Sequence, residues 1–446
     1  MDKIYRGYSI PENIKVAEYS SVINDVKIFL PSKPEILVEE FLNNTVRRVA
    51  EFRETYSSRE IPKIWEKAGV ECKKLCMEHL EILSSITKFP KEALEIYIKN
   101  IFDNLKENYL LKITETELGN IEYLDRFLPG IVGYTKAYGP KYVVHIFPET
   151  IGPQPLSTFQ ASIVKAPSIC KPASNELFFT KLWVDSLVTV DKDIGKYIWC
   201  IPWKSGNKNI ENKLFSNERC SIIVYGNHQT IDDIKSNAKG SVLGYPFKAG
   251  IEIVEIKECE DIYQIAPKLV TDITYMDQCA CFSPHIIYVI SENLSYPKKL
   301  CEEIAKIMDN YPVKRKELDT DNKAIISMLK HTYLLKKTVK LDIEIWEGKD
   351  YLILYENDPS FELSPLFRTI RVKPIKSLNE LKQILLEQSK YLQTIGTNLN
   401  KEKIADIFED CNISRVVDIG KMPINKLHHH EGKPLILPLI KWIDIE

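Results

Sequence analysis

From about residue 140 onwards, short runs of β-branched and aromatic residues alternate with segments whose apolar residues recur at helical spacing. The runs are typical of buried strands, and the second pattern is typical of amphipathic helices. Strands that alternate with helices form a parallel sheet with helices on its faces. The chain is therefore predicted to have an α/β fold. The predicted strands span residues 142–147, 196–201, 221–225, 251–256, 285–290, 339–346 and 351–355, and the predicted helices span 177–190, 231–237, 262–274, 298–309, 323–335 and 378–391.

The segment from about Ile36 to Leu105 shows the helical pattern alone. In it Cys72 and Cys76 lie one helical turn apart, and His79 follows. A metal site is one interpretation of these three residues, but a buried face between packed helices is the better one. A chain of 446 residues fits two or three domains of about 150 residues each. We therefore expect a helical lead-in, two α/β lobes with a boundary near residues 255–260, and a strand-like tail.

Charge and composition exclude several classes of protein. Lys and Arg number 60 against 62 Asp and Glu, so the net charge of -2 favours neither a nucleic-acid nor an anionic-membrane partner. The longest apolar stretch, PLILPLI, is shorter than the roughly 20 residues that span a bilayer. The N-terminus lacks a signal-peptide pattern. The 10 cysteines contain no pair of CxxC motifs, so no structural zinc site is expected. A cytoplasmic protein with reduced thiols is the expectation.

A cysteine loop lies directly ahead of the predicted strand 285–290. Its sequence, MDQCACFSP at 276–284, contains Cys279 and Cys281. A thiol in a loop beside a sheet can be partly exposed and can meet backbone N–H donors, which favours a nucleophilic thiolate. The alternative is a small buried hydrophobic residue, the usual role of a free cysteine.

Two further segments follow predicted strands. Lys171, in CKPAS at 170–174, stands where ligands bind in α/β sheets, although a solvated loop lysine is the alternative. Gly226, in YGNHQT at 225–230, permits close backbone approach before a helix start that offers N–H groups to a phosphate. An ordinary strand–helix turn explains this glycine equally well.

Three consecutive histidines, His428 to His430, precede Glu431 near the C-terminus. Consecutive side chains on a strand point to alternate faces, so the three imidazoles do not converge on one metal ion. A structural or interface role is therefore the preferred interpretation.

Taken in order, these segments resemble the LuxC family, the acyl-CoA reductase component of the fatty-acid reductase of bacterial luminescence. That family is a branch of the aldehyde dehydrogenase superfamily. The resemblance runs from about Leu124 to Glu446, and the cysteine loop and the tail weigh most in it. The matching segments are 142–153, 170–174, 224–234, 277–285, 366–381, 391–399, 414–423 and 428–446.

The resemblance implies an aldehyde dehydrogenase-like architecture in three parts. Residues 1–255 would hold the helical lead-in and a Rossmann-like NADP-binding domain. Residues 256–425 would form the catalytic domain with the nucleophilic cysteine. Residues 426–446 would form a terminal strand that pairs with another subunit, so a homo-oligomer, by default a dimer, is expected.

The resemblance also implies a reaction, in which NADPH reduces a long-chain acyl thioester of coenzyme A or of an acyl carrier to an aldehyde. The nucleophile of the family pattern corresponds to Cys281, and Cys279 falls at a variable position. Thr150 stands where the superfamily has an asparagine that donates to the oxyanion, and losing such a donor typically costs about a hundredfold in rate. The segment 243–248 lacks the general-base glutamate of aldehyde-oxidising relatives, which fits reduction rather than hydrolysis.

The cofactor residues come from the same resemblance. Lys171 and Ser174 match the positions beside the adenosine ribose, and Ser174 replaces a glutamate of NAD-preferring relatives, so NADPH is favoured. Phe147 is another implied cofactor contact. Gly226 and Asn227 match the turn beside the pyrophosphate, Gly244 would face the nicotinamide, and Glu362 would lie at the nicotinamide ribose.

Two other functions fit the same residues. One is a weakly active or non-catalytic scaffold that docks an acyl-protein synthetase, and Thr150 in place of the asparagine favours it. The other is a cysteine acyltransferase that passes the acyl group to another acceptor without reducing it.

Overall fold

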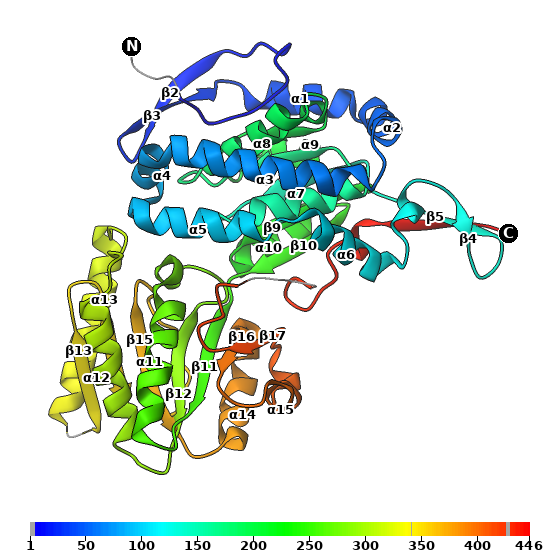
Figure 1. Ribbon diagram of the computed structural model, residues 1–446. Helices are drawn as coiled ribbons and strands as arrows, with labels where there is room; N and C mark the ends of the chain where they lie inside the picture. The colour runs from blue at the N-terminus through cyan, green and yellow to red at the C-terminus, as the bar shows by residue number, and fades with distance from the viewer. Residues whose placement is uncertain (1–4, 340, 425–428) are drawn as a thin grey trace. The chain divides into compact units, whose positions relative to one another are not determined.

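The computed structural model describes residues 5–339, 341–424 and 429–446, which form two compact units (Figure 1). Unit 1 comprises Met1–Thr87, Leu94–Pro246 and Pro434–Glu446, and unit 2 comprises Lys88–Ala93 and Phe247–Lys433. Each unit contains a sheet with helices on its faces, so the predicted α/β class is confirmed. In the described residues, no helix is both long enough and apolar enough to cross a membrane.

Unit 1 is built on a five-stranded parallel sheet with the order β10-β9-β6-β7-β8. From β6 the chain proceeds outward to β8 and then returns to the other side of β6 for β9 and β10. The strand order therefore reverses between β6 and β9, and in such sheets ligands bind beyond the carboxyl ends of the strands at this point. The strands are β6 (Tyr142–Ile146), β7 (Ser168–Lys171), β8 (Ile198–Cys200), β9 (Cys220–Gly226) and β10 (Ser241–Pro246).

Helices cover both faces of this sheet. On one face Phe41 of α1 and Ile231 of α10 join a buried cluster with Trp199 of β8. On the other side Trp65 of α3 packs edge-on against Trp183 of α8, with ring centroids 6.2 Å apart. The predicted helical lead-in is confirmed. The helices are α1 (Pro34–Asn43), α2 (Thr45–Thr55), α3 (Glu60–Glu78), α4 (Leu80–Thr87), α5 (Lys91–Asp103), α6 (Glu107–Leu118), η1 (Ile121–Leu124), α7 (Pro153–Ile163), α8 (Phe178–Val190), η2 (Ile194–Lys196), α9 (Lys208–Phe215) and α10 (His228–Asn237).

Two small sheets complete unit 1. The first, which the sequence did not predict, joins β1 (Tyr5–Arg6), β3 (Val26–Pro31) and β2 (Glu18–Ile23). In the second, the C-terminal strand β18 (Lys441–Ile445) pairs antiparallel with β5 (Tyr134–Tyr138) of the same chain, and β4 (Leu128–Pro129) adds a third strand. This ribbon projects from the rest of unit 1 (Figure 1).

The Glu117 carboxylate fixes the approach to β18. It accepts hydrogen bonds from the backbone N–H groups of Leu435, Ile436 and Leu437 at 2.7, 2.8 and 3.0 Å. These donors open the short helix η6 (Leu437–Leu439), whose first N–H groups have no partner within the helix. One side chain thus anchors the tail to unit 1.

Unit 2 is built on a seven-stranded sheet with the order β13-β14-β15-β12-β11-β16-β17. All neighbours are parallel except the edge pair β13 and β14. Helices α11 and α12 bury one face in an apolar cluster, and α14 and α15 cover the other. The elements are β11 (Ala249–Glu255), α11 (Cys259–Thr274), η3 (Tyr275–Gln278), β12 (Pro284–Ile290), α12 (Tyr296–Asp309), α13 (Thr320–Thr338), β13 (Ile343–Glu347), β14 (Leu352–Glu356), β15 (Thr369–Ile375), α14 (Leu378–Glu387), η4 (Ser389–Tyr391), β16 (Leu392–Thr397), α15 (Lys401–Ile407), η5 (Glu409–Cys411) and β17 (Arg415–Asp418).

The units divide differently from the expected segments 1–255, 256–425 and 426–446. Strand β11, expected in the first lobe, lies inside the second sheet because it pairs with β12 on one side and β16 on the other. The change between units falls between Pro246 and Phe247, directly ahead of this strand. The tail also divides: residues up to Lys433 group with unit 2, and Pro434–Glu446 group with unit 1.

Candidate active site

The cysteine loop of unit 2 begins with an unusual backbone. Met276, Asp277 and Gln278 have φ values of 49°, 47° and 65°, three consecutive left-handed residues without a glycine. Such conformations cost free energy and persist only where surrounding contacts hold them. They turn the chain sharply between α11 and the cysteines.

Asp277 supplies those contacts. Its carboxylate accepts hydrogen bonds from Arg368 Nε at 2.6 Å and from the Lys316 N–H at 2.7 Å. Its carbonyl accepts the N–H of Phe367 at 2.9 Å. Leu366, Phe367 and Arg368 are themselves left-handed, with φ values of 71°, 55° and 60°. Two strained segments thus hold each other around one buried ion pair.

Cys281 lies at the edge of the sheet where parallel strands begin. The adjacent strands β12, β11, β16 and β17 are parallel, so their amino ends meet at one edge. Cys281 precedes β12, Gln393 is the second residue of β16, and Arg415 is the first residue of β17. Three polar side chains from distant parts of the sequence therefore gather at this edge.

Cys281 is a partly exposed residue, and the surroundings of its thiol act on the thiol pKa in both directions. Burial raises the pKa of the thiol to about 11, and the charge of Glu431 adds to the rise. A hydrogen bond with the Gln393 side chain, the thiol's own backbone N–H and the charge of Arg415 lower the pKa. The thiolate therefore depends on donors and positive charge around it.

Arg415 is held in place by neutral groups. Its guanidinium donates to the backbone carbonyls of Met422 at 2.8 Å and Lys421 at 3.1 Å, and also to that of Ile424. It lies 5.9 Å from the ring centroid of Phe282, the residue that follows Cys281. The hydrogen bonds of the guanidinium thus go to neutral carbonyls, and its charge interacts with the Asp272 carboxyl as well as with the Cys281 thiol.

Cys279 has a different environment. Its thiol lies 3.7 Å from the Asp277 carbonyl, within its own loop, and burial raises its pKa to about 12. Of the two neighbouring thiols, only Cys281 has Gln393 and Arg415 among the groups that lower its pKa.

The described residues of the tail motif, Glu431 and His430, have pKa values that burial shifts in opposite directions. Glu431, in the left-handed region with φ of 51°, belongs to unit 2, and burial raises the pKa of its carboxyl to about 7. Burial lowers the pKa of His430 to about 4. His428 lies outside the described residues. The sequence interpretation of this motif as structural thus missed the action of Glu431 on Cys281. The other cysteine pair, Cys72 and Cys76, is fully buried in α3, as predicted.

The expected cofactor residues of unit 1 follow the carboxyl ends of parallel strands. Phe147 comes directly after β6, Lys171 ends β7, Gly226 ends β9 and Gly244 lies in β10. The Phe147 ring is buried and stacks on His145 and on Tyr225, with centroid distances of 5.7 and 6.2 Å. The sheet therefore brings this set to one edge.

Lys171 is suited to hold an anionic or hydroxyl-bearing ligand. Its side chain is almost buried, and its Nζ donates to Ser205 Oγ at 3.0 Å and lies 5.7 Å from the Trp203 ring centroid. An ammonium has three N–H donors, so others remain. Trp203 Nε1 is also buried and has no hydrogen-bond partner in the described residues. Both donors fit ribose and phosphate oxygens, and sequence reasoning missed Trp203 and Ser205, although they follow β8 at the same edge.

The remaining predicted residues of unit 1 have local explanations as well. The Asn227 side chain caps α10 by accepting the Thr230 N–H at 2.8 Å. A Cβ on Gly244 would lie 2.5 Å from Ile231 of α10, so packing requires this glycine. Ser174 is exposed, and Thr150 is half-buried in the bend after β6. Their contacts with a cofactor or substrate stay predictions.

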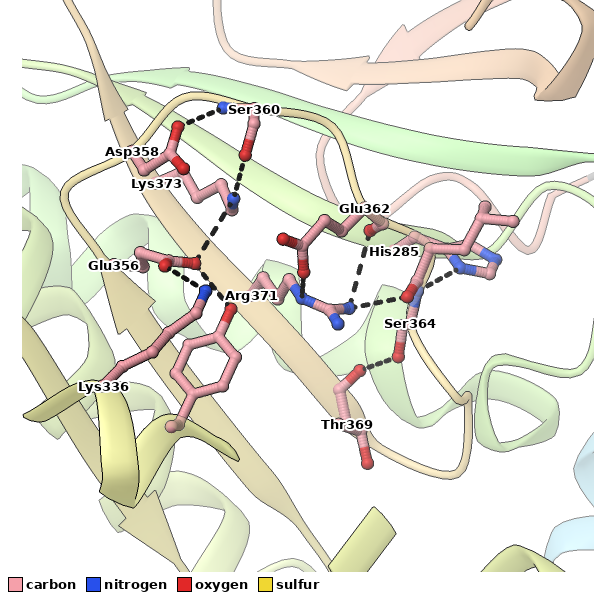
Figure 2. Close-up of polar contacts among 12 residues, drawn as sticks. His285, Lys336, Glu356, Asp358, Ser360, Glu362, Ser364, Thr369, Arg371 and Lys373 are labelled. Atoms are coloured by element: carbon pink, nitrogen blue, oxygen red, sulfur yellow. Dashed lines mark hydrogen bonds and ion pairs between the residues drawn. The ribbon is translucent and has the colours of Figure 1, made fainter. Parts of the chain in front are cut away.

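Glu362 of unit 2 is held by Arg371 of β15 (Figure 2). Arg371 Nε lies 3.2 Å from Glu362 Oε2, and Nη1 donates to the Leu363 carbonyl at 2.7 Å. The arginine is buried, whereas the glutamate side chain is 40% exposed. The buried Arg371 therefore holds a carboxylate that faces the solvent. On the neighbouring strand β14, Glu356 forms ion pairs with Lys336 and Lys373 at 2.6 and 3.6 Å.

Solved structures with a similar fold are aldehyde dehydrogenases. The NADP-dependent glyceraldehyde-3-phosphate dehydrogenase of Bacillus halodurans C-125, complexed with NADP, superimposes with a TM-score of 0.76 at 13% identity over 100% of both chains. Aldehyde dehydrogenase 21 of Physcomitrella patens, in complex with the reaction product succinate, gives a TM-score of 0.73 at 13% identity over 99% of this chain and 98% of that one. The chain therefore has the aldehyde dehydrogenase fold.

The sequence places it more narrowly. The model of the family Acyl-CoA reductase (LuxC) matches residues 57–441, and the chain belongs to this family. The resemblance is thus confirmed and begins earlier than the expected Leu124. Long-chain acyl-protein thioester reductase 2 of Photobacterium leiognathi is 24% identical over 347 residues, 76% of this chain and 70% of the relative. Long-chain acyl-protein thioester reductase of Aliivibrio fischeri is 25% identical over 348 residues, with the same coverage.

Proposed function

We propose that this protein reduces a long-chain acyl thioester to the aldehyde with NADPH, through an acyl group carried on Cys281. The observation that carries the proposal is the position of Cys281 beside Gln393 and Arg415 at one edge of the unit 2 sheet. The names of the relatives, long-chain acyl-protein thioester reductases, support the substrate class.

The residues of unit 2 supply the first half of the reaction. The Cys281 thiolate attacks the acyl carbon, the carrier thiol leaves with one proton, and one thioester replaces another. Arg415 stabilises the thiolate before the attack. Negative charge then develops on the carbonyl oxygen, and the Cys281 backbone N–H is the donor that unit 2 would supply. The role of the Thr150 hydroxyl as a second donor rests on the family resemblance alone.

NADPH, when bound, supplies the hydride that the acyl carbon accepts. The thiohemiacetal on Cys281 then releases the aldehyde and regenerates the thiolate. The segment 243–248 lacks the general-base glutamate of aldehyde-oxidising relatives, which fits reduction of the acyl-cysteine rather than its hydrolysis.

Lys171 and Ser174 are the proposed basis for the choice of NADPH over NADH. The ammonium attracts a 2′-phosphate, and Ser174 places no carboxylate against it. Glu362, held by Arg371, would accept hydrogen bonds from the nicotinamide ribose. Phe147, Gly226, Asn227 and Gly244 of unit 1 are the other proposed cofactor contacts.

The proposed partners follow from the same family. The thioester carrier is coenzyme A or an acyl carrier, and an acyl-protein synthetase is a candidate docking partner. A homo-oligomer formed through β18 is favoured by its exposed residues, with Trp442 and Ile443 at 38% and 42% exposure. The ten free cysteines favour a reducing, cytoplasmic location.

The test is an assay of the purified protein with a long-chain acyl-CoA and NADPH, following NADPH consumption and aldehyde formation. The proposal expects both, abolished by Cys281→Ala and retained by Cys279→Ala. Acylation of the protein without NADPH consumption would instead identify an acyltransferase. If the protein shows no acylation and no turnover, with or without a synthetase, the result would support the scaffold role.

A further inference from the structure

A pocket in unit 1 is lined by none of the proposed catalytic or cofactor residues. Its volume is about 440 Å³. It is formed by the end of α2 and the turn after it, the end of η1, strand β5 and the turn after α7. The residues that line it are Arg53, Glu54, Tyr56, Ser57, Leu124, Asp125, Lys136 and Lys165.

One lysine of the pocket is already paired. Lys165 is 2% exposed, and its Nζ donates to Asp125 Oδ1 at 2.6 Å and to the Tyr56 carbonyl at 2.7 Å. The Asp125 carboxylate also accepts the Ser58 N–H at 3.0 Å and the Ser58 hydroxyl at 2.9 Å. Both oxygens of this carboxylate therefore accept hydrogen bonds from Lys165 or Ser58.

Two other cations form no hydrogen bond with this carboxylate. Lys136 Nζ donates to the Asp125 backbone carbonyl at 2.7 Å, a neutral group. Arg53 Nη2 is buried and has no hydrogen-bond partner in the described residues. Both cationic groups lie 5.1 Å from the centroid of the Tyr138 ring, so they share one small region. Burial lowers the pKa of each. Arg219 lowers the pKa of Arg53 further and Tyr138 raises it, whereas Arg53 lowers the pKa of Lys136 and the Asp125 carboxylate raises it.

The pocket therefore offers donors and positive charge in excess. A lysine ammonium has three N–H groups, so Lys136 keeps two free and Lys165 keeps one, in addition to the free Arg53 N–H. A buried donor without an acceptor, here Arg53 Nη2, is costly, and a bound acceptor would remove that cost. The one other carboxylate in the lining, Glu54, is exposed.

We propose that this pocket binds a phosphate group, with Arg53, Lys136 and Lys165 as its ligands. Donors from three separate segments suit a tetrahedral oxyanion, and the positive charges of Arg53 and Lys136, which form no ion pair with Asp125, suit its negative charge. Inorganic phosphate and a phosphate ester such as that of coenzyme A carry the same group, and the experiment distinguishes them.

The experiment is calorimetric titration of the full chain with inorganic phosphate and, separately, with coenzyme A, at constant ionic strength set with chloride. The variants are Arg53→Gln and Lys136→Gln. Lys192→Gln, which removes an exposed lysine of the same unit, is the control. We expect saturable binding of at least one probe, weakened about tenfold or more in each pocket variant and unchanged in the control.

The outcomes separate clearly. Binding of inorganic phosphate assigns the pocket to the free anion, and binding of coenzyme A alone assigns it to the ester. No saturable binding of either probe to the wild-type chain overturns the proposal. Equal affinity in the wild type and in both folded pocket variants, checked by thermal unfolding, overturns it as well. Acyl reduction at Cys281 does not depend on any of these results.

Discussion

Asp277 and Arg368 form an ion pair in which the carboxylate and the guanidinium lie 2.6 Å apart and the side chains are 1% and 2% exposed. The pair joins two runs of left-handed residues, 276–278 and 366–368. The cysteine loop is therefore held by a contact between segments about ninety residues apart in the sequence, rather than by its own sequence.

Asp277→Asn should destabilise the protein strongly. It leaves Arg368 buried without a counter-charge, and breaking such a pair typically costs about 3–5 kcal/mol. Denaturant unfolding measures the loss. The matched control is Asp342→Asn, which breaks the exposed pair with Lys298 and should cost no more than about 1 kcal/mol. Equal free energies of unfolding for the wild type and Asp277→Asn would refute the supporting role.

Arg415→Gln and Glu431→Gln should change the reactivity of Cys281 in opposite directions. Arg415 lowers the pKa of the thiol and Glu431 raises it, so the first variant should slow alkylation and the second should accelerate it. Each unit of pKa corresponds to about a tenfold change in thiolate at a pH below the pKa. Iodoacetamide labelling of the Cys281 peptide, quantified by mass spectrometry between pH 7 and about 9, measures the rates. A change of the same sign in both variants would contradict this electrostatic assignment.

Ser174→Glu should weaken NADPH binding and leave NADH binding nearly unchanged. The new carboxylate would repel a 2′-phosphate near Lys171, and about tenfold weaker binding is the expected order of magnitude. Ser174→Gln, of similar size but neutral, is the control. Because Ser174 is exposed, neither change should affect folding. Fluorescence titrations with both cofactors measure the result, and equal losses for NADPH and NADH would exclude Ser174 from the 2′-phosphate site.

Glu176 should make unit 1 less stable as the pH rises. Burial raises the pKa of this carboxyl from its ordinary value of 4.5 to about 7, so the folded state binds more protons than the unfolded state between these values. Its contribution is fully present below about pH 4.5 and is lost as the pH rises through 7, a change of about 3 kcal/mol. The difference in unfolding free energy between wild type and Glu176→Gln should follow this curve. A difference that does not vary with pH would contradict the shift.

The elements that the sequence predicted well are those decided by local pattern. The β-branched runs of β6, β9 and β12 and the helical spacing of α8, α11 and α12 match the observed bounds closely. Strand β11 was also recognised, but its sheet was not, because membership depends on pairing with β16, which lies far along the chain.

In the candidate site as well, some residues are recognisable from the local sequence and others only from the tertiary structure. The cysteine loop and Lys171 follow from sequence motifs and Glu362 follows from the family resemblance, whereas Arg415, Trp203 and Arg371 follow from neither. These three residues become neighbours of the motif residues only through strand order and loop packing. A single arginine or tryptophan in an ordinary strand carries no local signal of that kind.

The central claim is that Cys281 carries the acyl group, and trapping that group tests it most directly. The protein is incubated with a long-chain acyl-CoA without NADPH, and its peptides are examined by mass spectrometry. The account predicts an acyl thioester on the peptide that contains Cys281, absent in Cys281→Ala, and its release as aldehyde when NADPH is added. A wild-type peptide that stays unmodified while the protein consumes NADPH and forms aldehyde would contradict the account.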